Sequence, residues 1–335
     1  MRDESVITLG EALVDRLGPL GGNPSFDLPV IDCFGGAPAN VACALGRLGV
    51  NVSFLGSLGN DAFGEDFKKL LLQREINIAG LQKDNMRPTR VVLVRRDSLG
   101  ERFFEGFEGD KGLGFADQAI SREQIITNWP LVRKNAKWLV LGTIPLASEI
   151  SSNAFLWCVE NAWHAGMKIA LDLNWRPTFW RNEVSTCFEP STEERNKIMS
   201  IAKKASLIKL AKEEAQWFFN TSNPAEISSS LPNRPSVVVT DGSKPVLWLL
   251  NNHFGKSLAI IPTSIVDTTG AGDAFTAGLI YKLISFELNQ INEQIAEEII
   301  KFAIACGSHV CKGIGAIDAQ PYLEDIEYLL SLSRG

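Results

Sequence analysis

The stretch Val266-Asp267-Thr268-Thr269-Gly270-Ala271-Gly272-Asp273-Ala274-Phe275-Thr276-Ala277-Gly278 joins a glycine-rich turn to an apolar pattern of helical period. The apolar positions on one helical face are Phe275, Leu279, Leu283 and Phe286. The pattern therefore predicts a helix that opens at about Gly270. The exposed N–H groups of such a turn and the positive end of the helix dipole favour an anion. We expect Gly270, Ala271 and Gly272 to hold a phosphate group.

Asp273 falls in the first turn of this predicted helix, beside the expected anion site. A carboxylate next to a phosphate can accept the proton of an attacking hydroxyl group, so Asp273 is our candidate for a catalytic base. The alternative interpretation is a plain tight turn followed by a favourable first-turn acid. No Gly-Lys-Ser/Thr follows the turn, which excludes a Walker A loop.

A second glycine-rich segment, Gly35-Gly36-Ala37-Pro38-Ala39-Asn40-Val41, lies near the start of the chain. The apolar pattern after it predicts a helix that stops near Gly49. Glycines let the backbone approach a ligand, and the Asn40 amide both donates and accepts, which suits a polyol. The alternative is a capping turn with Asn40 on the surface. Asp15 follows the first strand-like run and could accept from sugar hydroxyls, or it could be an ordinary turn residue.

The rest of the chain alternates short apolar runs with segments of helical length, and contains no internal repeat. The runs are Val6–Leu9, Val52–Leu55, Trp138–Leu141, Ile169–Leu173, Leu207–Leu210 and Val237–Thr240. Helix-length segments include 61–74, 151–165 and 192–205. Runs that are apolar on both faces and separated by helices predict an α/β fold with a mostly parallel sheet covered on both sides.

Two stretches interrupt this alternation, and both read as β-ribbon. They are Phe26–Phe34 and Arg90–Phe107, the second with a turn at 97–100. A β-sheet inserted in an α/β chain can close over a site and exclude water. We expect lid segments at about 16–34 and 88–110 within a single domain of residues 1–335. The alternative is a hairpin that only decorates the edge of the main sheet.

Composition narrows the range of functions. The 335 residues carry a formal net charge of −6, so a basic surface for nucleic acid is not expected. The longest apolar runs are too short to span a membrane. The N-terminus shows no secretory or transit pattern, and the six cysteines form no CxxC pair. We therefore expect a cytoplasmic protein with reduced thiols.

Both glycine-rich segments resemble the two signatures of the ribokinase-like, or PfkB, carbohydrate kinases. Gly35–Asn40 matches the first signature and Asp267–Asp273 the second, in the right order, and the resemblance runs from Val6 to about Pro321. Within this family the chain looks most like the bacterial and plant fructokinases. The segments that indicate this are Gly35–Val41, Asp172–Trp180, Lys209–Glu214, Ala305–Gly307, Gly315–Ile317 and Pro321.

The resemblance implies a Rossmann-like α/β/α core with a small β-sheet lid, and an ATP-dependent transfer of phosphate to a small sugar. Asp273 would be the base, with Gly270, Ala271 and Gly272 as the anion hole. The implied sugar-binding residues are Asp15, Gly35, Gly36, Asn40, Arg90 and Arg176. The implied nucleotide-binding residues are Lys209, Thr240, Gly242 and Ile304. Glu214 would order Mg²⁺ through water, and carbonyl oxygens of Asp267 and Thr269 could bind K⁺.

The sequence departs from the family pattern at three positions. Ala211 stands where relatives often have Asn, Pro245 replaces a glycine of the nucleotide loop, and Ile304 replaces Asn or His near the adenine. These changes bear on nucleotide affinity and nucleobase preference. The main alternatives are a kinase for ribose or 2-keto-3-deoxygluconate, and a catalytically silent fructokinase-like interaction protein.

We also expect a homodimer formed through the lid. A small sheet is not stable with one face in water. The apolar candidates for the face away from the sugar are Val92, Val94 and Phe103, or in the other register Val91 and Leu93. A second copy of the lid would cover that face by a two-fold contact.

Overall fold

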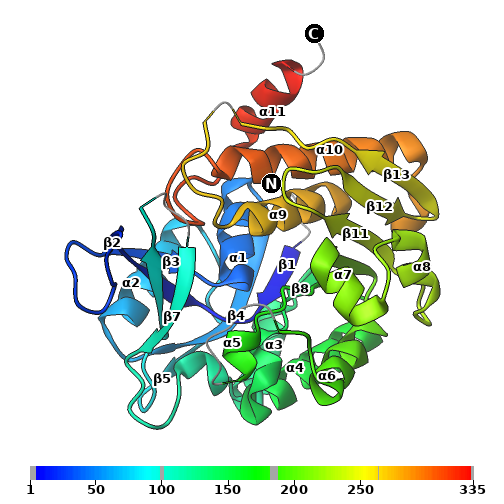
Figure 1. The fold of residues 1–335 in the computed structure, drawn as a ribbon. Helices are drawn as coiled ribbons and strands as arrows, with labels where there is room; N and C mark the ends of the chain where they lie inside the picture. Colours follow the sequence, from blue (N-terminus) through cyan, green and yellow to red (C-terminus); the bar gives the residue numbers. More distant parts are fainter. Residues whose placement is uncertain (1–4, 99–101, 182–187, 263, 333–335) are drawn as a thin grey trace.

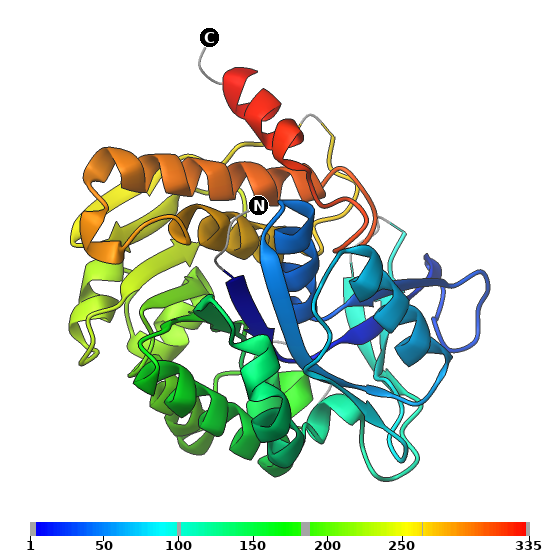
Figure 2. The same ribbon diagram turned by 180° about the vertical axis from the view of Figure 1, so that it is seen from behind.

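The computed structural model describes residues 5–98, 102–181, 188–262 and 264–332. Within these residues a nine-stranded main sheet lies between two layers of helices, and a four-stranded small sheet stands at its edge (Figures 1 and 2). The α/β class predicted from the sequence is confirmed, and all six apolar runs are buried strands of the main sheet.

The main sheet has the strand order β13-β12-β11-β10-β9-β8-β1-β4-β5. Its strands are β1 (Ser5–Leu9), β4 (Asn51–Gly59), β5 (Leu81–Asp84), β8 (Ala136–Leu141), β9 (Lys168–Asp172), β10 (Leu207–Ala211), β11 (Ser236–Thr240), β12 (Val246–Leu250) and β13 (His253–Ser257). Pairing is parallel from β5 to β11, and β12 and β13 are added antiparallel at the far edge. The carboxyl ends of the parallel strands therefore meet at one edge, where ligands bind in such sheets.

The helices on the two faces belong to two separate apolar clusters. One face packs against α1 (Ala37–Arg47), α2 (Ala62–Gln73), α9 (Ala271–Leu283) and α10 (Glu293–Val310), and α11 (Leu323–Leu332) joins the same cluster through α10. The other packs against α3 (Arg122–Val132), α4 (Glu149–His164), α6 (Thr192–Ala202), α7 (Lys212–Phe219) and α8 (Pro224–Ser229), with α5 (Pro177–Trp180) at its rim. Short 3₁₀ turns are η1 (Ala116–Gln118), η2 (Ile144–Ala147) and η3 (Leu288–Gln290). Helix α11 projects from the body beside α10 (Figure 1).

The small sheet has the order β3-β2-β6-β7 and is built from β2 (Leu13–Leu20), β3 (Ile31–Gly35), β6 (Val91–Arg96) and β7 (Arg102–Glu108). The predicted β6–β7 hairpin is confirmed, although residues 99–101 of its turn lie outside the described part. The predicted ribbon over Phe26–Phe34 is too long. Only Ile31–Gly35 is a strand there, and Pro29, which has no N–H to donate, precedes it.

The position predicted for Asp15, just beyond the first strand, is wrong. Strand β1 ends at Leu9, the chain crosses from the main sheet, and Asp15 lies inside β2, opposite Cys33 and Val92. In the sequence the apolar residues of β1 and of the start of β2 look like a single strand, because both of these strands are buried. Asp15 therefore belongs to the small sheet and not to the rim of the main sheet.

The register of the small sheet also decides between the two predicted faces. Val92 and Val94 pack with Leu13 and Leu17 on the face toward the main sheet, so the first proposed register is wrong. Val91 and Leu93 lie on the opposite face, as in the alternative register. They are 4% and 8% exposed in the single chain. These two residues are therefore already covered in the single chain, whereas Phe103, which was also predicted for the dimer face, is 39% exposed.

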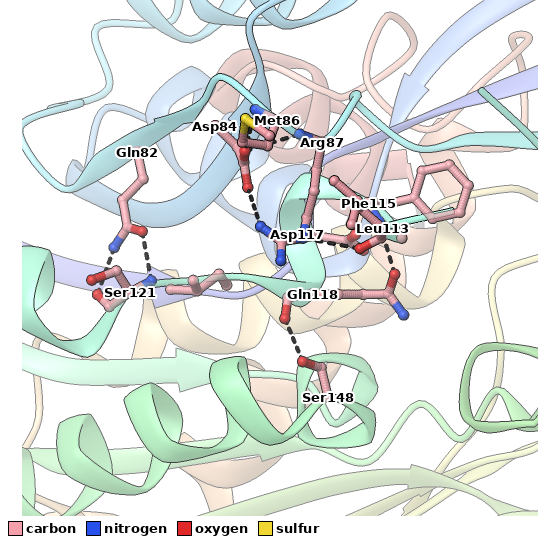
Figure 3. A network of polar contacts seen from close by, with 12 residues as sticks. Gln82, Asp84, Met86, Arg87, Leu113, Phe115, Asp117, Gln118, Ser121 and Ser148 are labelled. Atoms are coloured by element: carbon pink, nitrogen blue, oxygen red, sulfur yellow. Dashed lines mark hydrogen bonds and ion pairs between the residues drawn. The ribbon is translucent and has the colours of Figure 1, made fainter. Parts of the chain in front are cut away.

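A polar network fixes the segments that lead into and out of the β6–β7 hairpin (Figure 3). The Arg87 guanidinium donates to the Leu113 carbonyl at 3.0 Å, which ties together the chain before and after the hairpin. The side chain of Gln82 exchanges two hydrogen bonds with the backbone of Ser121, and the Ser148 hydroxyl donates to the Gln118 carbonyl. The base of the small sheet is thus anchored to the main domain.

Two further features concern the chain as a whole. In the described ranges no helix combines the length and the apolar character needed to cross a membrane. The cysteines within these ranges are free thiols, and Cys187 lies outside them.

Candidate active site

A cavity of about 540 Å³ lies between the small sheet and the carboxyl edge of the main sheet. Its wall combines residues of β2, β6 and β7 with the starts of α1 and α9, the segment that follows β9, and Lys209 of β10. The polar residues that line it include Glu11, Asp15, Asn40, Arg102, Asn174, Arg176, Lys209, Thr268, Thr269 and Asp273. Residues from both ends of the sequence therefore line one cavity.

The start of α9 forms the floor of this cavity. Gly270 is the N-cap with φ +79°, and a Cβ at this position would lie 2.6 Å from the Cβ of Ala316, so only glycine fits without strain. The helix begins at Ala271, as predicted. The N–H groups of Gly272 and Asp273 belong to the first turn and have no carbonyl one turn earlier in the helix. They are available to an anion, and the helix dipole adds to the attraction.

Asp273 is held by a residue from the other end of the chain. The Asn40 side-chain Nδ2 donates to Asp273 Oδ2 at 2.7 Å, which joins the two glycine-rich segments directly. Burial, reinforced by the negative charge of Asp172, raises the pKa of Asp273 to about 6, while the Asn40 hydrogen bond, Lys209 and Arg176 act in the opposite sense. A carboxyl group with this pKa is ionised at neutral pH and can still accept a proton.

A buried ion pair lies beneath the turn. Lys209 Nζ is 3.1 Å from each carboxylate oxygen of Asp172, and the Thr276 hydroxyl donates to Asp172 Oδ2 at 2.8 Å. A Cβ added at Gly272 would lie 3.1 Å from Lys209 Nζ, so the ammonium group sits directly against the turn. The positive charge of Lys209 therefore adds to the field at the predicted phosphate site.

The start of α1 has a different set of contacts. Gly36 is its N-cap with φ +102°, and a Cβ there would lie 2.5 Å from the Glu11 carbonyl oxygen. One oxygen of the Glu11 carboxyl group accepts from the Ala37 N–H at 3.0 Å. Asn40, one turn into the helix, is 4% exposed, and its Oδ1 has no partner among the described residues. This oxygen is free to accept a hydrogen bond from a ligand.

Asp15 and Arg176 both line the cavity, Asp15 from β2 and Arg176 from the segment after β9. Burial raises the pKa of Asp15 to about 6, and the positive charge of Arg102 is the largest opposing influence. Arg102, from β7, also pairs with Asp267 just before the α9 turn. The sequence reasoning missed Arg102 because nothing in the sequence shows which side of the hairpin faces the cavity.

Arg90 does not line the cavity. Its guanidinium forms two hydrogen bonds to Asp117, at 2.9 and 3.0 Å, and both side chains are at most 3% exposed. The rings of Phe107, Phe115 and Phe179 surround it at 4.4–4.9 Å. Phe179 itself lines the cavity. Arg90 thus supports the wall from behind, and its role in binding a sugar stays a prediction.

The residues predicted to bind nucleotide are only partly brought together. Lys209 faces the cavity, whereas Thr240 and Gly242, at the end of β11 and in the loop after it, do not line it. Ile304 is 5% exposed within α10. Because these three residues do not line the cavity, their role in binding the nucleotide stays a prediction.

The residues predicted for cations are placed as follows. Glu214 accepts from the backbone N–H groups of Trp175 and Ala211 at 2.6 and 2.7 Å, and each of its oxygens keeps a further lone pair. Among the described residues no group of three or more His, Cys, Asp or Glu is arranged to hold a metal ion. This donor set fits Mg²⁺ bound mainly by nucleotide phosphates, with protein carboxylates acting through water.

Asp267 organises the segment proposed for K⁺. Its Oδ1 accepts from the Thr269 N–H and hydroxyl at 3.0 and 2.7 Å, and its Oδ2 accepts from the Gly315 N–H at 2.8 Å. These bonds fix the backbone of 267–269, which carries the carbonyl oxygens predicted to bind K⁺. Asp172 is a further residue that the sequence reasoning did not assign, although an acid at the carboxyl end of a buried strand is a recognisable signal.

This arrangement matches a known family. Residues 30–322 match the description of the pfkB family carbohydrate kinases. The chain belongs to this family. The resemblance inferred from the two glycine-rich segments is thereby confirmed, and the chain is a sugar kinase of the pfkB type.

Individual relatives agree with the family. The chain is 32% identical over 331 residues to "Probable fructokinase-4" of Arabidopsis thaliana, covering 97% of this chain and 96% of the relative. The crystal structure of the Xylella fastidiosa fructokinase with bound ATP is similar over the whole length of both chains, with a TM-score of 0.84 at 25% identity. A second similar crystal structure is that of a fructokinase double mutant from Vibrio cholerae O395 in fructose, ADP and potassium ion bound form. The match covers 98% of this chain and 98% of that chain, with a TM-score of 0.80 at 27% identity.

Proposed function

We propose that this pfkB-family kinase is a fructokinase, which transfers the γ-phosphoryl group of ATP to O6 of D-fructose. The observation that carries the proposal is the 2.7 Å hydrogen bond from Asn40 to Asp273, because an amide suited to a polyol then lies beside a buried carboxyl group at the glycine-rich start of α9. The plant and bacterial relatives named as fructokinases support fructose as the acceptor.

In the proposed reaction the fructose hydroxyl attacks the γ-phosphorus while the bond to the β–γ bridging oxygen breaks. Asp273 accepts the hydroxyl proton, and the products are fructose 6-phosphate and ADP. The N–H groups of Gly272 and Asp273, together with Lys209, stabilise charge on the transferring group. Asp15, Gly36 and Asn40 hold the sugar so that its hydroxyl is in line.

Cations have a supporting role in this proposal. Mg²⁺ would neutralise charge on the phosphates, with Glu214 ordering its water ligands. K⁺ would bind carbonyl oxygens of Asp267 and Thr269. The support for K⁺ is the fixed backbone of that segment, together with the potassium-bound form of the Vibrio cholerae relative.

A second acceptor is favoured by one observation. The cavity is lined by two arginines, Arg102 and Arg176, and a guanidinium pairs well with a carboxylate. The sugar acid 2-keto-3-deoxygluconate carries such a group, so it is the main competitor of fructose. A silent interaction protein would not need the Asn40–Asp273 contact or the Lys209–Asp172 pair, and both are intact.

An ADP-release assay over fructose, 2-keto-3-deoxygluconate, ribose, glucose and adenosine tests this proposal. We expect the highest kcat/KM with fructose. A preference for the sugar acid, lost in Arg176→Met, would assign the second candidate. ADP release with none of these acceptors would reject the kinase assignment.

We further propose that the protein is a cytoplasmic homodimer that associates through the small sheet. The support is now the exposed apolar tip of the β2–β3 connection, where Leu20, Phe26 and Leu28 are 62%, 86% and 82% exposed. Sedimentation at micromolar concentration should give a dimer, and Phe26→Asp with Leu28→Asp should give a monomer. A monomeric wild-type protein, with and without sugar, would reject the dimer.

A further inference from the structure

Glu11 is a buried carboxyl group of the cavity wall to which the proposed reaction gives no role. It lies in the crossing between β1 and β2, is 1% exposed, and lines the cavity together with Asp15, Asn40 and Asp273. One of its oxygens accepts from the Ala37 N–H at 3.0 Å, and the other has no partner in the described part of the chain. Burying a carboxyl oxygen without a hydrogen-bond partner costs free energy, so this group requires an explanation.

The contact with Ala37 places Glu11 at the first turn of α1. The N-cap of this helix is Gly36, whose missing side chain cannot accept from the first-turn amides. Glu11 therefore accepts from a first-turn N–H group, as an N-cap side chain would, although it lies 26 residues earlier in the sequence. The Glu11 carbonyl oxygen also lies against Gly36, because a Cβ added at Gly36 would be 2.5 Å from this oxygen. Glu11 thus contacts the start of α1 through both its side chain and its backbone.

These contacts also bear on the position of Asn40 relative to Asp273. Asn40 lies one turn into α1, and its N–H donates to the Gly36 carbonyl at 2.8 Å. Its side chain then donates to Asp273. The position of the Asn40 amide is therefore defined by a continuous series of contacts that begins at Glu11. A shift of the first turn of α1 would move Asn40 relative to both Asp273 and the sugar.

We propose that Glu11 is a positioning residue of the sugar site, which holds the first turn of α1 so that Asn40 reaches Asp273 and the sugar together. The role in sugar binding rests on the proposed function, whereas the capping of α1 does not. Because Glu11 shares the cavity with other carboxyl groups, the neutral form is the one that suits this position. Ionisation would place another negative charge beside Asp117 on η1 and Asp273 on α9.

The electrostatics of the site agree with this role. Burial raises the pKa of Glu11 to about 8, and the negative charges of Asp117 and Asp273 act in the same direction. The hydrogen bonds from its own backbone and from Ala37 oppose the shift. Glu11 is therefore mostly protonated at neutral pH and becomes charged as the pH rises through about 8.

The test compares Glu11→Gln and Glu11→Ala with the wild-type enzyme. Gln keeps the oxygen that accepts from Ala37 and mimics the neutral acid, so sugar KM and kcat at pH 7 should stay within about twofold of wild type. Ala removes the contact, so the sugar KM should rise about tenfold or more while the ATP KM changes less than about twofold. Equal rises in both KM values for Ala would overturn the proposal.

The pH profile supplies a readout that a merely structural role would not move. Between pH 7 and 9.5 an ionised Glu11 keeps its contact with Ala37 but adds a negative charge to the cavity that also holds Asp273. The wild-type kcat/KM for sugar should therefore fall in this range, and Glu11→Gln should not show this fall. Identical alkaline profiles for the two proteins would contradict the proposal. The matched control is Glu194→Ala, because Glu194 is also buried and accepts from a helix-start amide, that of Ser191 at 2.7 Å, but does not line the cavity. This control should leave the sugar KM unchanged.

Amide hydrogen exchange of residues 37–45 in the ligand-free protein makes the test independent of the substrate. We expect exchange to accelerate about tenfold in Glu11→Ala and to stay at the wild-type rate in Glu11→Gln. If the wild type phosphorylates no sugar, the proposed function fails and the exchange comparison still decides whether Glu11 holds α1. Unchanged exchange in Glu11→Ala overturns the inference whatever the substrate is.

Discussion

The starts of α1 and α9 follow the same local plan but are prepared for different ligands. Both helices open on a glycine with positive φ, and neither N-cap supplies a side-chain acceptor. At α1 the Ala37 N–H is already bound by Glu11, and Pro38 has no N–H at all. At α9 the N–H groups of Gly272 and Asp273 face the cavity beside Lys209. The α1 start therefore suits a neutral polyol and the α9 start suits an anion.

This difference teaches that a glycine-rich helix start is not in itself a phosphate site. What decides its ligand is whether the protein already fills the first-turn amides and which charge lies beneath them. Substitutions at the two starts should therefore affect different substrates, and the following experiments separate them.

The largest effect is expected for Asp273→Asn, at the α9 start. Removal of a general base typically lowers the rate by about 10²–10⁴-fold, so kcat should fall by this factor. The ATP affinity, measured by calorimetry, should change less than about twofold, because the N–H groups of the turn remain. A variant that keeps more than half of the wild-type kcat would remove Asp273 from the role of base.

Gly272→Ala tests the turn itself. The new Cβ would lie 3.1 Å from Lys209 Nζ, and since Gly272 has no positive φ, the helix can still form. Displacement of the ammonium group should lower kcat on the order of 10- to 100-fold. The sugar KM should change little, and thermal unfolding should show that the fold is retained. A larger effect on sugar KM than on kcat would contradict the division between the two helix starts.

Asn40→Ala is the matching change at the α1 start. A sugar hydroxyl would lose a buried partner at a cost of about 1–3 kcal/mol, which is about 5- to 150-fold in sugar KM. The ATP KM should be nearly unchanged in steady-state kinetics. If both KM values rise equally, Asn40 supports the structure of the site and does not bind sugar.

The smallest effect is expected from acidification. Burial raises the pKa of Asp273 to about 6, so below this pH the base becomes protonated, and kcat/KM should fall about tenfold per pH unit. A raised pKa means that the folded protein binds the proton more tightly than the unfolded chain does. The contribution of Asp273 to the free energy of unfolding therefore grows as the pH falls through this value, and is lost as it rises.

Two measurements check this prediction together, namely kcat/KM between pH 5 and 8 and thermal unfolding over the same range. We expect activity to decline on the acid side without a parallel loss of stability from this group. A flat kcat/KM down to pH 5 would contradict a pKa near 6 in the free enzyme. Asp15, whose pKa is also raised to about 6, could steepen the decline beyond one proton.

The sequence by itself determined the fold class, the helices that start at the two glycine-rich segments, and the family. The reason is that these properties follow from local patterns. Buried parallel strands read as apolar runs, amphipathic helices have a period of 3.6 residues, and a turn with positive φ needs glycine. The same local signal led to Asp273, because its position in the first turn is a matter of spacing alone.

Only the tertiary structure decided which side chains share the cavity and in which state. The Asn40–Asp273 hydrogen bond joins residues 233 positions apart, and the register of β6 against β2 turned Val92 and Val94 inward, contrary to the first expectation. Arg90 forms a buried ion pair with Asp117 behind the wall of the cavity. Glu11 acquired its contacts and its raised pKa through burial against α1, and burial depends on elements that are distant in the sequence.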